Sequence, residues 1–374
     1  MTSLHVRPRQ TLYRDPTTFS AFPSIACLGD GTLLLSFRRA PDHRRLLKPS
    51  ARDAAVDSVD HLHPKSHIAL RRLGPDLTPL GEIWAMPQHP AAADQDTSLI
   101  RCRNGRIVHL GFLWLPVTEE REQLQPPLNG MAQGSGPAYL AWHAYARTSD
   151  DDGASWSDYR PFPPDPLLRP DLDGLVPGTA AIRGQAVETA DARLLCAAYA
   201  GHLVAPVTRG LRLYESGDGG NRWRPVGALI AHSEARLSET SLVAWPAGRI
   251  SLFARTARAD DRIAYAVSDD GISFTEPRLL PIRGHPTAAH PLTDGRLLLV
   301  YGYRHAPYGV RARILRPDRP FDHSREEIIV ADAPGPDTGY PWVAPVGAGR
   351  VAVVYYRADA DGIRGIDGSL IDID

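Results

Sequence analysis

Ionisable side chains gather at the ends of short apolar segments in this chain of 374 residues. Some precede a segment, and others follow the apolar segment that comes next. They are Asp96, Arg183, Glu239, His285 and Tyr340 before a segment, and Arg38, Arg39, Asp42, His43, Arg255, Arg304 and His305 after one. Guanidinium groups bind carboxylates through paired hydrogen bonds, so this set favours a site for a sugar that carries an acidic group.

A unit of two apolar segments joined by a tight turn recurs six times and must position these residues. Its turns are Asp30-Gly31, Asn104-Gly105, Asp191-Ala192, Ala247-Gly248, Asp294-Gly295 and Ala348-Gly349. Most of these pairs are typical of the turn that closes a two-residue β-hairpin. Further strand-like segments lie between the units, at 66–73, 139–149, 210–216, 262–268 and 308–315.

The repeat predicts an all-β fold, a six-bladed β-propeller, with residues 1–374 as one domain. Four strands per period make one blade, and the strand around Leu4 to Tyr13 is expected to complete the last blade. A β-sandwich is the poorer interpretation because one hairpin type recurs six times. The segments 41–66, 118–137 and 161–180 are rich in Pro, Gly and charge, and we expect them to be loops.

The two strands of each unit run antiparallel, so the start of the first and the end of the second lie at the same end of the hairpin. The connecting turns fall at the opposite end. Six blades therefore direct the ionisable residues towards one axial pocket, and concave sites of this kind are where small ligands bind.

Composition excludes several classes of function. The formal net charge of −1 provides no global field for nucleic acid or for an anionic membrane. The N-terminus has no apolar signal segment and no window is long enough to span a membrane, so we expect a cytoplasmic protein, or a secreted one if a leader was removed. His61, His63 and His67 stand without cysteines or a carboxylate cluster, so no metal or other cofactor is expected. Oligomeric state is left open.

Two segments carry the pattern Ser-x-Asp-x-Gly-x-x-Trp, from Ser149 to Trp156 and from Ser216 to Trp223. A degenerate third copy is expected from Val267, where the leading Ser is lost. In such a turn the Asp accepts backbone N–H groups, Gly supplies a positive φ, and the aromatic ring packs under the hairpin. The pattern resembles the Asp-box of sialidases and other Asp-box propellers. The Asp of each copy is therefore interpreted as a residue of the fold.

The chain also resembles exo-sialidases residue by residue, in the same order along the sequence. Glu239 and Arg255, one hairpin apart in SETSLVAWPAGRISLFAR, look like the family's Glu and second Arg. Arg304, which ends DGRLLLVYGYR, matches the third Arg, and Tyr340 in TGYPWVAPVGAGR stands where the family carries its nucleophilic Tyr. Asp42, in the loop after the first hairpin, stands where the acid/base Asp is expected.

This resemblance implies a retaining exo-glycosidase that removes a terminal sialic-acid-like sugar from a glycan. Tyr340 would attack the sugar, Glu239 would take its proton, and Asp42 would protonate the departing oxygen. Arg255 and Arg304 would hold the carboxylate. The implied partner is a glycan or glycoconjugate with an acidic terminal sugar, and the mechanism implies no cofactor.

One residue departs from the family's pattern. The family's first Arg opens the first blade, and Ala21 stands at that position within Ser-Ala-Phe-Pro. Three arginines at neighbouring strand ends are candidates to replace it, namely Arg38, Arg39 and Arg183. Further substrate contacts are expected by position alone from Asp96, His43 and His305.

Other interpretations stay open at this point. The propeller could bind glycans without catalysis, or it could be a polysaccharide lyase in which Tyr, His and Arg carry out β-elimination on uronates. Single residues also have structural interpretations: Glu239 as a surface carboxylate beside Arg236, Arg304 as the partner of Asp337, and Asp42 as part of a solvated loop.

Overall fold

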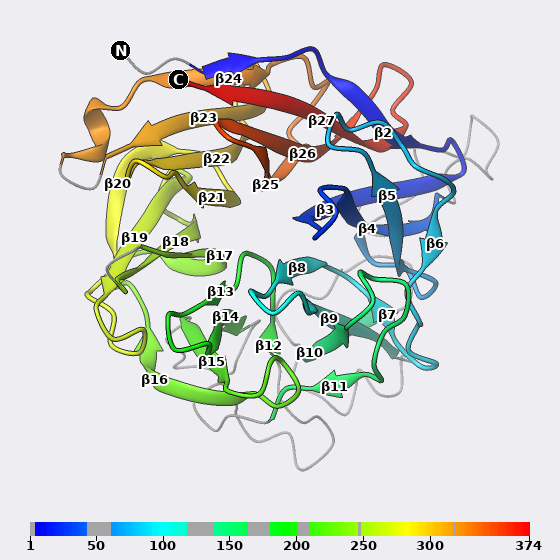
Figure 1. The fold of residues 1–374 in the computed structure, drawn as a ribbon, viewed down its shortest axis with the longest axis horizontal. Coiled ribbons are helices and arrows are strands. Elements are labelled where there is room, and N and C mark those ends of the chain that lie inside the picture. The colour runs from blue at the N-terminus through cyan, green and yellow to red at the C-terminus, as the bar shows by residue number, and fades with distance from the viewer. Residues whose placement is uncertain are drawn as a thin grey trace.

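The fold is known from a computed structural model, which describes residues 4–42, 61–117, 138–163, 180–200, 210–245, 248–316 and 319–374. The described strands form six antiparallel sheets arranged around a ring (Figure 1). The protein is a six-bladed β-propeller, as the repeat predicted. The predicted loop 118–137 and most of 41–66 and 161–180 lie outside the described residues. Among the described residues, no helix has the length and apolar character needed to cross a membrane.

In the first three blades each sheet begins with its innermost strands and ends with the outermost strand. Blade one consists of β3 (Thr18–Cys27), β4 (Leu33–Pro41), β5 (His67–Leu73) and β6 (Trp84–Ala85). Blade two consists of β7 (Ala93–Asp94), β8 (Ser98–Arg101), β9 (Ile107–Val117), β10 (Ala138–Ser149) and β11 (Arg160–Pro161). Blade three consists of β12 (Ala180–Ala181), β13 (Val187–Glu188), β14 (Leu194–Ala200), β15 (Leu211–Ser216) and β16 (Arg224–Ile230).

The last three blades follow the same order and close the ring. Blade four consists of β17 (Arg236–Ala244), β18 (Ile250–Ala257), β19 (Arg262–Ser268) and β20 (Arg278–Arg283). Blade five consists of β21 (Thr287–Pro291), β22 (Leu297–Tyr303), β23 (Gly309–Leu315), the 3₁₀ helix η4 (Phe321–His323) and β24 (Glu326–Val330). Blade six consists of β25 (Gly339–Gly347), β26 (Arg350–Ala358), β27 (Arg364–Ile373) and the N-terminal strands β1 (Leu4–Val6) and β2 (Gln10–Arg14).

The apolar core is divided among the interfaces between neighbouring blades. Each of six buried clusters draws its side chains from two adjacent blades, including the interface between blades six and one. Alternating strand residues point to the two faces of a sheet, so every blade contributes one face to each neighbouring interface. This packing fixes the angle between blades, and with it the positions of the inner strand ends.

Five of the six hairpin turns contain three residues, where the sequence predicted mostly two. In the first, the N–H of Leu28 donates to the carbonyl of Thr32 at 2.8 Å, and four further turns repeat this spacing. The third loop residue has a positive φ, 82° at Gly31 and 63° at Ala192. This is the three-residue hairpin loop whose last residue is left-handed. In it the Asp-Gly pair occupies the second and third loop positions, whereas in a two-residue loop it would occupy the first and second. The turn between β25 and β26 has the predicted two residues.

The Asp-box turns join the two outermost strands of blades two, three and four, namely β10 to β11, β15 to β16 and β19 to β20. In blade three, Asp218 accepts the backbone N–H groups of Asn221 at 3.1 Å and Arg222 at 2.9 Å. The indole N–H of Trp223 donates to the carbonyl of Gly220 at 3.1 Å. These bonds are the turn chemistry that the pattern predicted, and they use the Asp within the fold.

The third Asp-box keeps its leading Ser, so the prediction that Val267 replaces it was wrong. Ser268 donates to Asp270 at 2.8 Å, and Asp270 accepts two backbone N–H groups at 2.7 Å each. Gly271 directly follows Asp270, whereas one residue separates Asp from Gly in the other two copies. This shorter spacing shifted the sequence match by one residue.

The glycine of each Asp-box is packed against the preceding blade. A Cβ atom added at Gly153 in blade two would come within 2.6 Å of Leu34 in blade one, and one at Gly220 in blade three within 2.8 Å of Val108 in blade two. The glycine of the third box approaches blade three in the same way. Besides permitting the turn, the glycine therefore lets neighbouring blades pack closely at this end of the ring.

A buried carboxylate joins the two ends of the chain in blade six. Asp367 is fully buried, and its oxygens lie 2.8 Å from Arg357 Nε, 3.1 Å from Arg14 Nη2 and 3.6 Å from Arg9 Nε. Arg9 directly precedes β2 and Arg14 is its last residue, whereas Arg357 belongs to β26. The N-terminal strands pair with β27, as predicted, and this ion-pair network holds them there.

We expect Asp367→Asn to destabilise the protein by about 3–5 kcal/mol, because it leaves the buried Arg357 guanidinium without its ion-pair partner. The free energy of unfolding in urea measures the effect. Asp332→Asn is the matched control, since Asp332 also pairs with Arg9 but has 58% of its side chain exposed, and it should cost at most about 1 kcal/mol. Equal losses in both variants would contradict this account of ring closure.

Candidate active site

A tyrosine, a glutamate and an arginine from two separated blades meet near the inner strand ends. Tyr340 Oη donates to Glu239 Oε1 at 2.5 Å. Arg255 Nη1 donates to Glu239 Oε2 at 2.8 Å and to Tyr340 Oη at 3.1 Å. Glu239 and Arg255 lie on β17 and β18 of blade four, and Tyr340 lies at the start of β25 in blade six. The three side chains therefore form one closed hydrogen-bonded cluster.

Irregularities in the inner strands set the direction of these side chains. The register of β17 against β18 shifts between Ser238 and Thr240, so Glu239 is the extra residue of a bulge, with a φ of 26°. Tyr340 lies in the equivalent shift of β25, with a φ of 48°. A bulge re-aims the side chain that it carries, and positive φ at residues other than glycine is strained backbone that concentrates at functional sites. Both reactive groups thus lie on distorted strand starts.

The charges of this cluster are set by burial and by Arg255. Burial raises the pKa of Glu239, but the Arg255 guanidinium and the Tyr340 hydrogen bond outweigh it and hold this pKa below its usual value. Burial, followed by the Glu239 charge, raises the pKa of Tyr340 well above that of a free phenol. At neutral pH the pair is therefore a carboxylate that accepts from a neutral phenol, which is the state required of a general base beside a nucleophile.

Arg304 lies over the ring of Tyr340. It directly follows β22, and its guanidinium carbon is 5.3 Å from the ring centroid. Its Nε is buried and has no hydrogen-bond partner within the described parts of the chain. The sequence left open a pairing with Asp337, but Asp337 instead binds Tyr356 at 2.6 Å and Arg364 at 2.5 Å. Arg304 thus presents a donor group beside the cluster.

Asp96 adds a second buried carboxylate on the start of β8. It is 4% exposed, and its Oδ1 has no hydrogen-bond partner in the part of the chain that the structure describes. Burial raises the pKa of Asp96 to about 7, with Arg183 as the largest opposing influence and Glu239 as a further raising one. The carbonyl of the next residue, Thr97, accepts from Arg183, whose guanidinium carbon also lies 5.4 Å from the ring centroid of Tyr340.

Arg183 ties four blades together through main-chain carbonyls. From blade three its guanidinium donates to the carbonyl of Thr97 at 2.5 Å in blade two, of Pro23 at 2.9 Å in blade one, and of Tyr340 at 3.4 Å in blade six. It also lies 4.9 Å from the ring of Trp342. These bonds give Arg183 a structural role at the centre of the ring, and the ligand contact expected of it stays a prediction.

The arginines at the end of β4 diverge. Arg39 donates to Tyr13 at 2.8 Å and Asp15 at 3.2 Å, so the structure joins it to the N-terminal strand and not to Glu239. Arg38 is fully buried on the neighbouring position, directly opposite Ala21, and lowers the pKa of Asp96. Cross-strand neighbours have adjacent side chains, so Arg38 lies beside the position at which Ala21 stands in place of the family's first arginine.

The remaining predicted contacts are placed as follows. Asp42 directly follows β4, is 2% exposed and donates its backbone N–H to the carbonyl of Thr17 at 2.9 Å. It is therefore a buried residue and not part of a solvated loop, and its role as proton donor stays a prediction. His43 lies outside the described residues. His305 Nε2 lies 3.1 Å from Asp261 Oδ2.

Two aromatic side chains pack beside the cluster, at a strand start and a strand end where antiparallel pairing predicted pocket residues. Phe22 occupies the blade-one bulge with a φ of 56°, and its ring centroid lies 4.7 Å from that of Tyr340. Tyr356 lies 5.8 Å from Tyr340, ring to ring. Position was the only signal for both residues, because Phe22 stands at a strand start and Tyr356 at a strand end.

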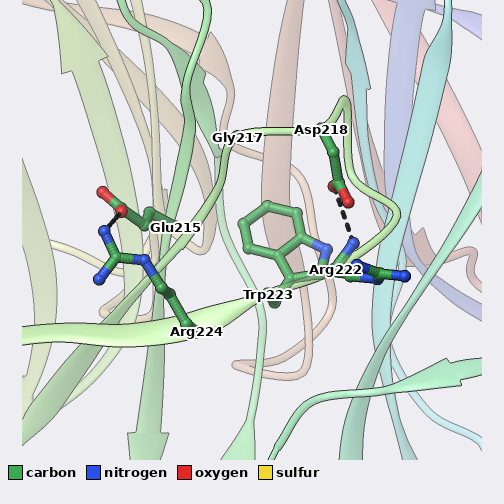
Figure 2. A pocket seen from close by; sticks show the side chains of 6 residues that line it. All are labelled: Glu215, Gly217, Asp218, Arg222, Trp223 and Arg224. Carbon is green, nitrogen blue, oxygen red and sulfur yellow. Dashed lines mark hydrogen bonds and ion pairs between the residues drawn. The ribbon is translucent and has the colours of Figure 1, made fainter.

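A surface pocket of about 230 Å³ lies away from the Tyr340 cluster, beside the Asp-box of blade three. Figure 2 shows Glu215 paired with Arg224 on one side of it, with Trp223 between them and Asp218. Ser216, at the end of β15, pairs with Leu194 at the start of β14, so this hollow lies at the end of the blade opposite to the one that carries the cluster. Its charged groups are bound within the fold.

Comparison with known families identifies the chain. Residues 97–353 match the family described as the BNR repeat-like domain. The chain belongs to this family. The match covers most of the propeller, and the solved structures below include sialidases with the same fold. No curated protein sequence matches the chain.

Several solved structures share the propeller fold with this chain. A protein of unknown function from Dyadobacter fermentans is 28% identical with a TM-score of 0.86, and the alignment covers 99% of each chain. The NanB sialidase from Streptococcus pneumoniae is 15% identical with a TM-score of 0.67, over 97% of this chain and 70% of its own. A leech intramolecular trans-sialidase is 14% identical with a TM-score of 0.63, over 98% and 70%. At these identities the two sialidases show likeness of fold alone.

The raised pKa of Asp96 predicts a stability that falls as pH rises. Its folded pKa of about 7 lies above the ordinary value of 3.8, so the folded protein holds a proton between these values that the unfolded chain releases. The stability contributed by protonated Asp96 is complete below about pH 4 and is lost as pH rises to about 7. Asp96→Asn should therefore raise Tm at pH 8 by a few degrees, on the order of 2–4 °C, and change it little at pH 4. A constant difference across this range would contradict the assignment.

Proposed function

We propose that this protein hydrolyses the glycosidic bond of a terminal sialic-acid-like sugar, with retention of configuration. The observation that carries the proposal is the closed contact among Tyr340, Glu239 and Arg255. A buried phenol that donates to a buried carboxylate is a nucleophile with its base in place. The likeness in fold to a bacterial sialidase and a leech trans-sialidase supports the same reaction class.

The chemistry of the substrate explains why a neutral nucleophile is suitable. The anomeric carbon of a sialoside bears a carboxylate, which repels an anionic nucleophile. Tyr340 Oη attacks this carbon while its proton passes to Glu239, so no second negative charge is present before the reaction. Asp42 gives a proton to the departing oxygen and then takes one from the water that cleaves the sugar from Tyr340. Asp96, with a pKa of about 7, is a second candidate for this proton donor.

The guanidinium groups supply the binding of the acid. Arg304 has a buried Nε without a partner in the described residues and lies over the nucleophile, so its fork is available to the sugar carboxylate. Arg255 remains beside it, shared with Glu239. Arg38 replaces the missing first arginine from the strand opposite Ala21. By holding the sugar carboxylate, these guanidinium groups also favour the flattened oxocarbenium geometry of the transition state.

Ala21 favours a second candidate, a propeller that binds acidic glycans without cleaving them. A carboxylate clamp with one arginine fewer holds its ligand less rigidly, and rigid positioning contributes much of a glycosidase's rate. Fluorogenic sialosides distinguish the two functions, because a binding protein retains the sugar without releasing the fluorophore. An ultraviolet-absorbing unsaturated product from a uronate polymer would instead indicate a lyase.

We expect Tyr340→Phe to lower kcat on a fluorogenic sialoside by at least roughly 10³-fold, because the attacking oxygen is removed. Glu239→Gln should lower kcat by roughly 10²–10⁴-fold through the loss of the base. Tyr355→Phe is the matched control, since Tyr355 is a fully buried phenol that contacts Ser369 at 3.3 Å. Full activity in the Tyr340→Phe protein would rule out this nucleophile.

Arg304→Met should raise KM for the sialoside by roughly 10- to 100-fold, the size expected for lost hydrogen bonds to a charged group. The methyl ester of the same sialoside provides the test of contact. Esterification of the substrate should raise KM strongly for the wild-type enzyme and much less for the Arg304→Met variant, because this variant already lacks the arginine that binds the carboxylate. Arg325→Met, which removes an exposed arginine of equal charge, serves as control. Equal sensitivity to esterification in both proteins would show that Arg304 does not bind the acid.

A further inference from the structure

Two histidines share one carboxylate beside the proposed active site. Asp261 Oδ1 lies 3.1 Å from His285 Nε2, and Asp261 Oδ2 lies 3.1 Å from His305 Nε2. His285 heads the inner strand of blade five, the blade between the one that carries Glu239 and the one that carries Tyr340. It is 4% exposed, whereas 38% of the His305 side chain is exposed. One histidine of this group is therefore interior to the ring.

The backbone around Asp261 is built to hold this contact. Asp260 and Asp261 both have a positive φ, 54° and 55°, in the turn between β18 and β19. The carbonyl of Asp261 accepts the N–H of Gly284 at 2.9 Å, and the N–H of His285 donates to Gly302 at 2.8 Å. Strained residues persist where the surrounding structure fixes them, and here two hydrogen bonds fix the carboxylate and the imidazole relative to each other.

The charges that face His285 keep its imidazole neutral. Burial is the largest influence that lowers the pKa of His285, to about 4, and Arg255 and Arg304 lower it further. Glu239 and Asp261 oppose them and are outweighed. A carboxylate oxygen can only accept, and Asp261 Oδ1 lies 3.1 Å from Nε2, so this contact places the proton of the neutral imidazole on Nε2 and leaves a lone pair on Nδ1.

The Nδ1 atom of His285 is a further polar atom of the site that lacks a partner in the described parts of the chain, besides Arg304 Nε and Asp96 Oδ1. It is buried and has no hydrogen-bond partner among the residues that the structure describes. Buried polar atoms are almost always partnered, so an unpartnered acceptor beside a binding site indicates a donor that arrives with the ligand. The neighbouring guanidinium groups already face the acidic part of the sugar. Sugar hydroxyl groups are the donors that a neutral imidazole accepts from.

We infer that His285 is a specificity-determining residue, whose Nδ1 accepts a hydrogen bond from one hydroxyl group of the bound acidic sugar. Asp261 is its positioning residue, which fixes the tautomer and the orientation of the ring. The inference deepens the proposed function and rests on the sugar being bound at Tyr340. It assigns the site a requirement for a hydroxyl group at one ring or side-chain carbon, in addition to the carboxylate.

The test compares binding of N-acetylneuraminic acid with its 4-, 7-, 8- and 9-deoxy derivatives by isothermal titration calorimetry, using the full-length protein. His285→Ala should raise Kd for the parent sugar by roughly five- to tenfold, the loss of one hydrogen bond. One deoxy derivative should bind wild-type protein weaker by a similar factor and bind the His285→Ala variant no worse than the parent does. His285→Asn keeps an acceptor at the place of Nδ1 and should restore most of the affinity.

Controls separate this inference from a loss of folding and from the proposed reaction. His290→Ala removes a partly buried imidazole from β21, the strand that begins two residues after His285, and should leave Kd unchanged. Unchanged affinity in His285→Ala, equal sensitivity of both proteins to every deoxy sugar, or no binding of these sugars by the wild type would overturn the inference. Binding that follows the expected pattern without hydrolysis of a fluorogenic sialoside would instead contradict the proposed reaction and leave the His285 contact standing.

Discussion

The hydrogen bond from Tyr340 to Glu239 spans two blades that are not neighbours, and the site depends on that distance of 2.5 Å. A buried carboxylate is stable only when it is paired and hydrogen-bonded, and Arg255 and Tyr340 together satisfy Glu239. Blades four and six must therefore keep a fixed separation. The six apolar interfaces provide it, Arg183 binds carbonyls of three other blades, and the network around Asp367 prevents the ring from opening at blade six.

The two ends of the blades divide stability and chemistry between them. At one end the hairpin turns and Asp-boxes use their polar groups internally, and the Asp-box glycines allow neighbouring blades to pack closely. At the other end the inner strands are irregular, and residues such as Phe22, Glu239 and Tyr340 have positive φ. The regular end supports the strain of the irregular one, in keeping with the general observation that strained backbone persists where the rest of the fold determines it.

Local patterns predicted the architecture, because a strand, a tight turn and an Asp-box are each encoded within a few residues. The six hairpins, the strands between them and closure by the N-terminal strand were all predictable, although five of the six turns proved one residue longer. The positions of Glu239, Arg255, Arg304 and Tyr340 followed from antiparallel pairing, which places strand starts and ends together.

Long-range contacts could not be predicted in the same way. Arg183 and Arg39 stood at site positions in the sequence. In the folded protein Arg183 donates to main-chain carbonyls, and Arg39 donates to Asp15, which follows the N-terminal strand β2. The contact of Asp261 with His285 depends on left-handed residues in a turn and on hydrogen bonds from another blade. Neither leaves a periodic pattern, so neither is visible before the chain is folded.

If Tyr340 attacks the sugar, the covalent sugar–tyrosine intermediate can be trapped. A 3-fluorosialosyl fluoride forms the glycosyl-enzyme but slows its hydrolysis, and mass spectrometry of the digested protein locates the added sugar. We expect a mass increase of one fluorinated sugar on the peptide that contains Tyr340, at the tyrosine oxygen. An adduct on any other residue, or steady turnover of a sialoside without any adduct, would show that Tyr340 is not the nucleophile.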